Sequence, residues 1–131
     1  GELSYPNGIA FSPDEKTLYV AVSDPKLAIW MAYDVKPDGT IANGRVFFNA
    51  TDRVKEGNGL PDGMKVDKQG NLFATGPGGV FVFTPEGKHL GTIDTGQPTG
   101  NCAWGDDGST LYIMANHYLS RIKTSTVGNG F

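Results

Sequence analysis

Three Pro-x-Gly triplets in this chain of 131 residues are each followed by a similar pattern. The triplets begin at Pro6, Pro61 and Pro98. Each is followed by an alternating stretch such as Ile9 to Phe11, an acidic turn that contains glycine or proline, and a second apolar stretch. Because alternation with a period of two places successive side chains on opposite faces of a strand, each unit is predicted to begin with a β-hairpin.

Two further strands are predicted after the first and second hairpins, which completes one four-stranded antiparallel sheet per unit. These strands are predicted over residues 28–35, 45–48, 79–84 and 89–93. The turns between them read Pro-Asp-Gly at 37–39 and Pro-Glu-Gly at 85–87, where proline presets φ and glycine accepts a positive φ. The third unit has a third strand over 118–124, after which STVGNGF predicts a weak or missing outer strand.

The repeat and the composition together predict an all-β fold, a β-propeller fragment of about three four-stranded antiparallel blades. A composition of 19 Gly and 8 Pro favours many short strands joined by turns. Successive units with a spacing near 40 residues are typical of propeller blades. We predict one partial domain over 1–131, with blades at about 6–50, 61–96 and 98–131. A β-sandwich is the alternative, although a sandwich has no reason to repeat the triplet.

Three blades are too few to close a propeller, which usually needs four to eight. Each blade buries its two faces against its neighbours, so an open stack of three leaves two apolar end faces in water. Exposed apolar patches of that size mark association surfaces. We therefore expect a partner. It is either a missing N-terminal half or a second copy of the chain, which would form a homodimeric ring of six blades.

Four segments of the chain resemble the SMP-30/gluconolactonase/luciferin-regenerating family. They are PNGIAFSPDEKTLYV at 6–20, LPDGMKVDKQGNLFATG at 60–76, GGVFVFTPEGKHLGTI at 78–93 and TGNCAWGDDGSTLYIMA at 99–115. Taken together they cover nearly the whole chain, in the order of the C-terminal half of a family member about twice as long. The resemblance implies half of a six-bladed propeller. It also implies the hydrolysis of a sugar lactone such as gluconolactone, or of a related ester.

The resemblance also implies a divalent cation in the central channel, commonly calcium, with magnesium, manganese or zinc as alternatives. In the family a Glu, two Asn and an Asp hold the cation, and the matching motifs make Asn7 and Asp62 two of these ligands. The Glu and the other Asn would belong to the N-terminal half. Amide and carboxylate oxygens suit calcium or magnesium. The third triplet carries Thr99, a weaker ligand.

By the same resemblance, Asp62 is the candidate catalytic residue, which would orient or deprotonate the attacking water. Without the resemblance it would be an ordinary turn residue. His117, in the segment ANHY after a strand, is a candidate substrate contact at the channel mouth. The alternative function is a catalytically inactive propeller fragment that acts as a self-associating or binding module, since two of the four expected ligands would be absent.

Several other classes of function and site find no support in the sequence. The net charge is −3 and the eleven Lys and Arg are scattered, so no nucleic-acid partner is expected. No apolar stretch approaches the length of about 20 residues that spans a bilayer, so no membrane partner is expected, and the compartment stays open among cytoplasmic, periplasmic and secreted. Cys102 is expected in the core, Trp30 and Trp104 between blades, and His89 on the surface.

Overall fold

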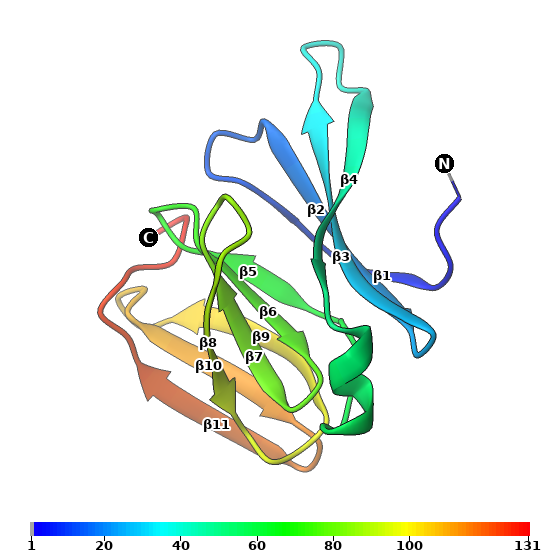
Figure 1. Ribbon diagram of the computed structural model, residues 1–131. Helices are drawn as coiled ribbons and strands as arrows, with labels where there is room; N and C mark the ends of the chain where they lie inside the picture. The colour runs from blue at the N-terminus through cyan, green and yellow to red at the C-terminus, as the bar shows by residue number, and fades with distance from the viewer. Residues whose placement is uncertain (1) are drawn as a thin grey trace.

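The computed structural model describes residues 2–131, so Gly1, the first residue of the predicted domain, lies outside it. The described strands form three antiparallel sheets, in which each strand pairs with the next along the chain (Figure 1). The first sheet contains β1 (Pro6–Phe11), β2 (Thr17–Asp24), β3 (Leu27–Val35) and β4 (Ile41–Asn49). The second contains β5 (Met64–Val66), β6 (Leu72–Gly76), β7 (Gly79–Phe83) and β8 (His89–Asp94). The third contains β9 (Thr99–Gly105), β10 (Thr110–Ala115) and β11 (Tyr118–Lys123).

This arrangement confirms the predicted all-β propeller fragment over the sandwich, because three successive sheets stack with a separate core at each junction. The third sheet has three strands among the described residues, so its outer strand, which was predicted to be weak or missing after Thr124, is missing there. The segment between the first two sheets contains a short 3-10 helix, η1 (Thr51–Lys55). Among residues 2–131 no helix has the length and apolar character needed to cross a membrane.

The core between the first and second sheets is built on Trp30, which is fully buried. Its ring centroid lies 5.3 Å from those of both Phe81 and Phe83. Phe47 and Phe48 on β4 pack against the same cluster, so the aromatic side chains come from β3, β4 and β7. Such pairs each add about 0.5–1.5 kcal/mol beyond the burial of their area. Trp30 therefore packs between blades, as the sequence predicted.

The core between the second and third sheets contains the other tryptophan. The ring centroids of Trp104 and Phe73 lie 4.9 Å apart, and the Trp104 Nε1–H donates to the Val66 carbonyl at 3.1 Å. Cys102 is buried in this core, which confirms its predicted place. His89 differs from its predicted surface position. It is half-buried, with its ring stacked 5.0 Å from Phe81, because the β7–β8 pairing brings its side chain over the aromatic cluster.

The segment after β11 returns to the second sheet instead of adding a strand to the third. Its contacts centre on Asp67, which is fully buried and accepts a hydrogen bond from Thr126 Oγ1 at 2.7 Å. The Lys68 N–H donates to the Val127 carbonyl at 2.8 Å, and the Asn129 N–H to the Val66 carbonyl at 3.0 Å. These bonds join the second and third sheets at the turn end of their inner hairpins.

The burial of Cys102 makes its thiol unreactive in the folded protein. The side chain is 3% exposed, and removal from water raises its pKa to about 11. Only about one thiol in a thousand is ionised at pH 8, and the thiolate is the reactive form. We expect Ellman's reagent to modify the native protein slowly and the protein in guanidinium rapidly. Fast modification of the native protein would contradict this placement of Cys102.

Candidate functional site

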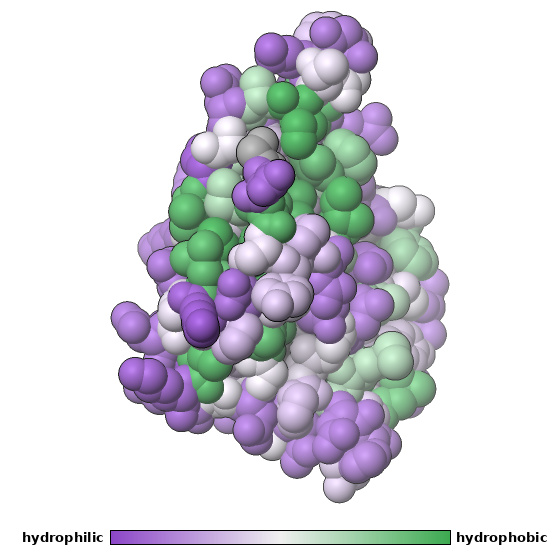
Figure 2. Space-filling view, turned by 90° about the vertical axis from the view of Figure 1, so that its right-hand side faces the viewer, coloured by the Kyte–Doolittle hydropathy of each residue, from purple (hydrophilic) through white to green (hydrophobic). Residues whose placement is uncertain are grey.

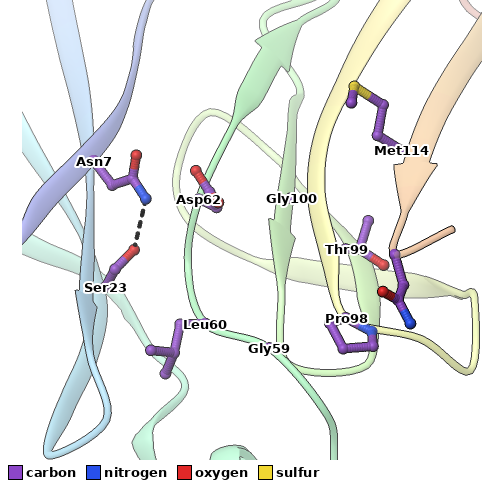
Figure 3. A pocket seen from close by; sticks show the side chains of 10 residues that line it. Asn7, Ser23, Gly59, Leu60, Asp62, Pro98, Thr99, Gly100 and Met114 are labelled. Carbon is purple, nitrogen blue, oxygen red and sulfur yellow. Dashed lines mark hydrogen bonds between the residues drawn. The ribbon is translucent and has the colours of Figure 1, made fainter.

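The three Pro-x-Gly triplets meet at one end of the inner strands. β1, β5 and β9 are the inner strands of their sheets and lie next to one another along the stack. At their entrance is an open hollow of about 520 Å³, which is within the size range of small-molecule sites. The middle residues of the triplets, Asn7, Asp62 and Thr99, all line this hollow (Figure 3). The structure thus brings together residues that are far apart in the sequence.

The glycine of the triplet explains this convergence, because the backbone of the next inner strand occupies the place where a Cβ of that residue would lie. A Cβ on Gly8 would overlap the Asp62 carbonyl. A Cβ on Gly63 would lie 2.9 Å from the Gly100 carbonyl, which already accepts the Gly63 N–H at 3.0 Å. Glycine is therefore required for space at these positions, so that each inner strand can contact the next.

Asn7 is exposed to the hollow, and its amide is held in one orientation. Its Nδ2 donates a hydrogen bond of 3.1 Å to Ser23 Oγ, and the Ser23 hydroxyl in turn donates to the Pro61 carbonyl. The nitrogen therefore lies on the Ser23 side and Oδ1 on the other (Figure 3). Among the residues that the structure describes, Oδ1 has no hydrogen-bond partner.

Asp62 is half-buried beside Asn7, and its backbone is anchored by an N–H that donates to the Thr75 carbonyl at 3.0 Å. Burial raises the pKa of the Asp62 carboxyl above its usual value, and the Gly63 backbone N–H partly opposes this rise. Within residues 2–131 no other side chain hydrogen-bonds the carboxylate. Its oxygens are therefore available to a ligand in the hollow.

Thr99 lines the hollow but is poorly suited to bind there. Its side chain is 2% exposed, and its hydroxyl already contacts Thr95 Oγ1 at 2.6 Å and the Gln97 carbonyl at 3.0 Å. A hydroxyl with these partners has little capacity left for a ligand.

His117 is not among the residues that line the hollow, although the neighbouring Asn116 is. Both lie in the turn between β10 and β11, and His117 is exposed to solvent there. The sequence interpretation did not single out Asn116 or Ser23. Asn116 is part of the ANHY segment from which only the histidine was chosen, and nothing in the sequence around Ser23 distinguishes it from other strand ends.

The ligand atoms that Asn7 and Asp62 offer to the hollow are oxygens, although Met114 also lines it, and oxygen ligands suit a hard cation better than one that prefers nitrogen or sulfur. Asn7 Oδ1 and the Asp62 carboxylate are two such ligands on one wall. No group of three or more His, Cys, Asp or Glu that could hold a metal occurs in the described part of the chain. Because calcium takes six to eight oxygen ligands, water or other groups would have to supply the rest.

Antiparallel sheets of three or four strands that stack with their inner strands around a shared hollow are blades of a β-propeller. The sequence profile of the SMP-30/gluconolactonase/LRE-like region matches residues 1–117. The chain therefore belongs to this family, as the four sequence segments predicted.

Comparison with known proteins agrees with this assignment. The chain is 44% identical to a gluconolactonase of Zymomonas mobilis over 96% of its own length and 36% of the relative's. It matches the solved structure of a Xanthomonas campestris gluconolactonase with a TM-score of 0.81 and 34% identity, over 94% of this chain and 39% of that one. The structure of a calcium-binding protein, regucalcin, from Agrobacterium tumefaciens shares the fold, with a TM-score of 0.74 at 24% identity. The match covers 48% of the regucalcin chain, so this chain spans less than half the length of each of the three relatives.

The role of the triplet glycine can be tested at Gly8. We expect Gly8→Ala to lower the free energy of unfolding by about 1–3 kcal/mol, because its methyl group would collide with the Asp62 backbone. Gly91→Ala on β8 is the matched control, since a Cβ there meets nothing within 4 Å. The control should change stability by less than about 0.5 kcal/mol in urea unfolding. Equal effects of the two substitutions would show that the inner strands do not need this contact.

Proposed function

We propose that the chain forms part of a metal-dependent lactone hydrolase of the gluconolactonase type. The observation that carries the proposal is the convergence of the Asn7 amide oxygen and the Asp62 carboxylate on one hollow, although 55 residues separate them in the sequence. The likeness to gluconolactonases supports a lactone as the substrate class. The size of the hollow also accommodates a sugar-sized molecule.

In this proposal Asn7 and Asp62 hold a divalent cation. Oxygen ligands favour calcium or magnesium, and the fold shared with a calcium-binding regucalcin supports calcium. When bound, the cation would stabilise negative charge on the carbonyl oxygen of the lactone. Asn7 contributes a neutral ligand, whereas Asp62 contributes the negative charge that balances the ion.

Asp62 has a second role in the proposal, as the group that accepts a proton from water. The water oxygen attacks the carbonyl carbon while the carboxylate takes up the proton. The ring C–O bond then breaks, and the departing oxygen takes the proton held by Asp62, which gives a hydroxy acid and restores the carboxylate. In the metal-free protein, partial burial raises the pKa of the Asp62 carboxyl.

The outer faces of the first and third sheets carry exposed apolar side chains. On the first sheet, Ile9, Val20, Met31 and Val46 pair across all four strands to form one row, and Ile9 and Val46 are 61% and 54% exposed. Apolar side chains gather on this face (Figure 2). On the third sheet, Met114 and Leu119 are paired and exposed. Residues with this pattern are those a blade buries against its neighbour.

We propose that further blades of the same protein cover both faces, because the relatives are more than twice as long as this chain. A second copy of the chain is the competing occupant, and it would favour the function of a self-associating module. In either case the cover would bring additional channel residues next to Asn7 and Asp62, since inner strands of neighbouring blades lie side by side.

The catalytic proposal predicts different effects for the two ligands in the full-length natural protein. Asp62→Asn should lower kcat/KM for gluconolactone by about 10²-fold or more, because the proton acceptor is lost. Asn7→Ala should mainly weaken calcium binding, so added calcium should restore part of the activity. Asp38→Asn, in the exposed turn between β3 and β4, is the matched control. A pH indicator follows acid release. The activity is measured first after EDTA has removed the metal and then after excess calcium has been added. Full activity of Asp62→Asn would contradict the proposal.

If further blades cover both end faces in the full-length natural protein, that protein should not bind an apolar dye such as ANS. The isolated chain exposes these faces and should bind the dye. Val46→Ser with Leu119→Ser should reduce dye binding, whereas Leu90→Ser, at an exposed position on β8, should not. Native mass spectrometry gives the assembly state in parallel. A dimer of two 13.9 kDa chains that binds no dye would show that a second copy of the chain, and not further blades, covers the end faces. A dye-free monomer would contradict both.

A further inference from the structure

Ser23 lies at the end of β2, outside every Pro-x-Gly triplet, yet it connects the two proposed ligand segments. Its hydroxyl contacts the Asn7 side chain in the first blade and the Pro61 carbonyl, directly before Asp62, in the second. Its own N–H donates to the Tyr5 carbonyl at 2.9 Å, which holds the Ser23 backbone in place. The hydroxyl is half-buried, so water competes less for it than for an exposed serine.

The chemistry of this bridge leaves one consistent direction for its hydrogen bonds. The Pro61 carbonyl can only accept, so the single hydroxyl hydrogen of Ser23 must point to it. Ser23 Oγ then presents a lone pair toward residue 7, so it can only accept a hydrogen bond from the side chain there. The donor of an asparagine side chain is Nδ2, and its placement on the Ser23 side turns Oδ1 away from Ser23.

We propose that Ser23 is a positioning residue that orients the Asn7 amide, so that Oδ1 rather than Nδ2 is presented as a ligand. The same bridge selects asparagine over aspartate at position 7. A carboxylate offers Ser23 only acceptors, and it could be satisfied only if the hydroxyl hydrogen left the Pro61 carbonyl. This chain would then contribute one carboxylate to the hollow, that of Asp62, and one neutral oxygen. The inference rests on the proposed function, because a cation is the ligand that requires Oδ1.

The first test needs no metal. In the metal-free protein, one Asn7 Nδ2 proton is hydrogen-bonded to Ser23, so the two side-chain amide protons should be well separated in the nitrogen-proton NMR spectrum. Ser23→Ala should collapse that separation toward the value of a free asparagine. Ser23→Thr keeps the hydroxyl and should preserve the separation. An unchanged Asn7 signal in folded Ser23→Ala would overturn the inference, whether or not the protein binds metal.

The second test measures calcium affinity by titration calorimetry on the full-length natural protein. Removal of an outer partner that orients a ligand typically weakens metal binding 10–100-fold, so we expect this loss for Ser23→Ala and recovery in Ser23→Thr. Asn7→Asp should weaken binding in the wild-type background and much less in combination with Ser23→Ala, because the conflict with Ser23 is then absent. Equal effects of Asn7→Asp in both backgrounds would overturn the selection argument.

The outcomes separate this inference from the proposed function. If the wild-type protein binds no calcium, the proposed function fails, and the amide spectrum alone decides the role of Ser23. If the wild-type protein binds calcium and folded Ser23→Ala binds it equally well, the proposed function stands and the inference fails. Thermal unfolding of each variant checks its fold. Should Ser23→Ala unfold, Ser23→Cys keeps the size of the side chain with a weaker acceptor, and it should show the same losses to a smaller degree.

Discussion

Backbone contact between neighbouring inner strands, at the glycines of the Pro-x-Gly triplets, is the constraint on which the rest of this structure depends. Gly8 lies against the Asp62 carbonyl, and Gly63 donates to Gly100, so successive blades almost touch at their inner edge. Farther out, the gap between the first two blades is filled by Trp30 with the aromatic side chains of β4 and β7. The junction is narrow at the inner strands, where the residues are glycines, and wide farther out, where the side chains are aromatic. This wedge shape turns each sheet relative to the next, so that the blades are arranged around an axis.

The site is a direct result of that wedge. Because the inner edges meet, the middle residue of each triplet lies next to that of the following blade, and a binding site is assembled between sheets that fold as separate units. Its parts differ in character: Asn7 is exposed, Asp62 is half-buried with a raised pKa, and Thr99 is occupied by its own neighbours. Ser23 joins the first two blades where the proposed ligands stand, so ligand geometry depends on the blade junction as well as on either strand.

The three sheets are not equivalent in how completely they are covered. Every residue of β6, in the middle sheet, is buried, whereas every residue of β11, at the edge of the third, is exposed. The segment after β11 partly compensates, since it binds the fully buried Asp67 and ties the third sheet to the second. Its bonds lie at the turn end of the inner hairpins, so the outer face of the third sheet stays open with Met114 and Leu119. Both end faces of the stack therefore expose apolar side chains.

The amino-acid sequence by itself determined the strands, their grouping into blades and the family. These depend on local patterns: alternation with a period of two, turn residues at fixed offsets and a triplet that recurs. The family resemblance carried by these motifs identified Asn7 and Asp62 as candidates, and the structure places both on one hollow. Tertiary structure alone decided the bridge from Ser23 to Pro61, 38 residues apart, and the bond from Thr126 to Asp67, 59 residues apart. Such contacts depend on how whole sheets pack, and no local pattern records which distant residue will lie opposite a given side chain.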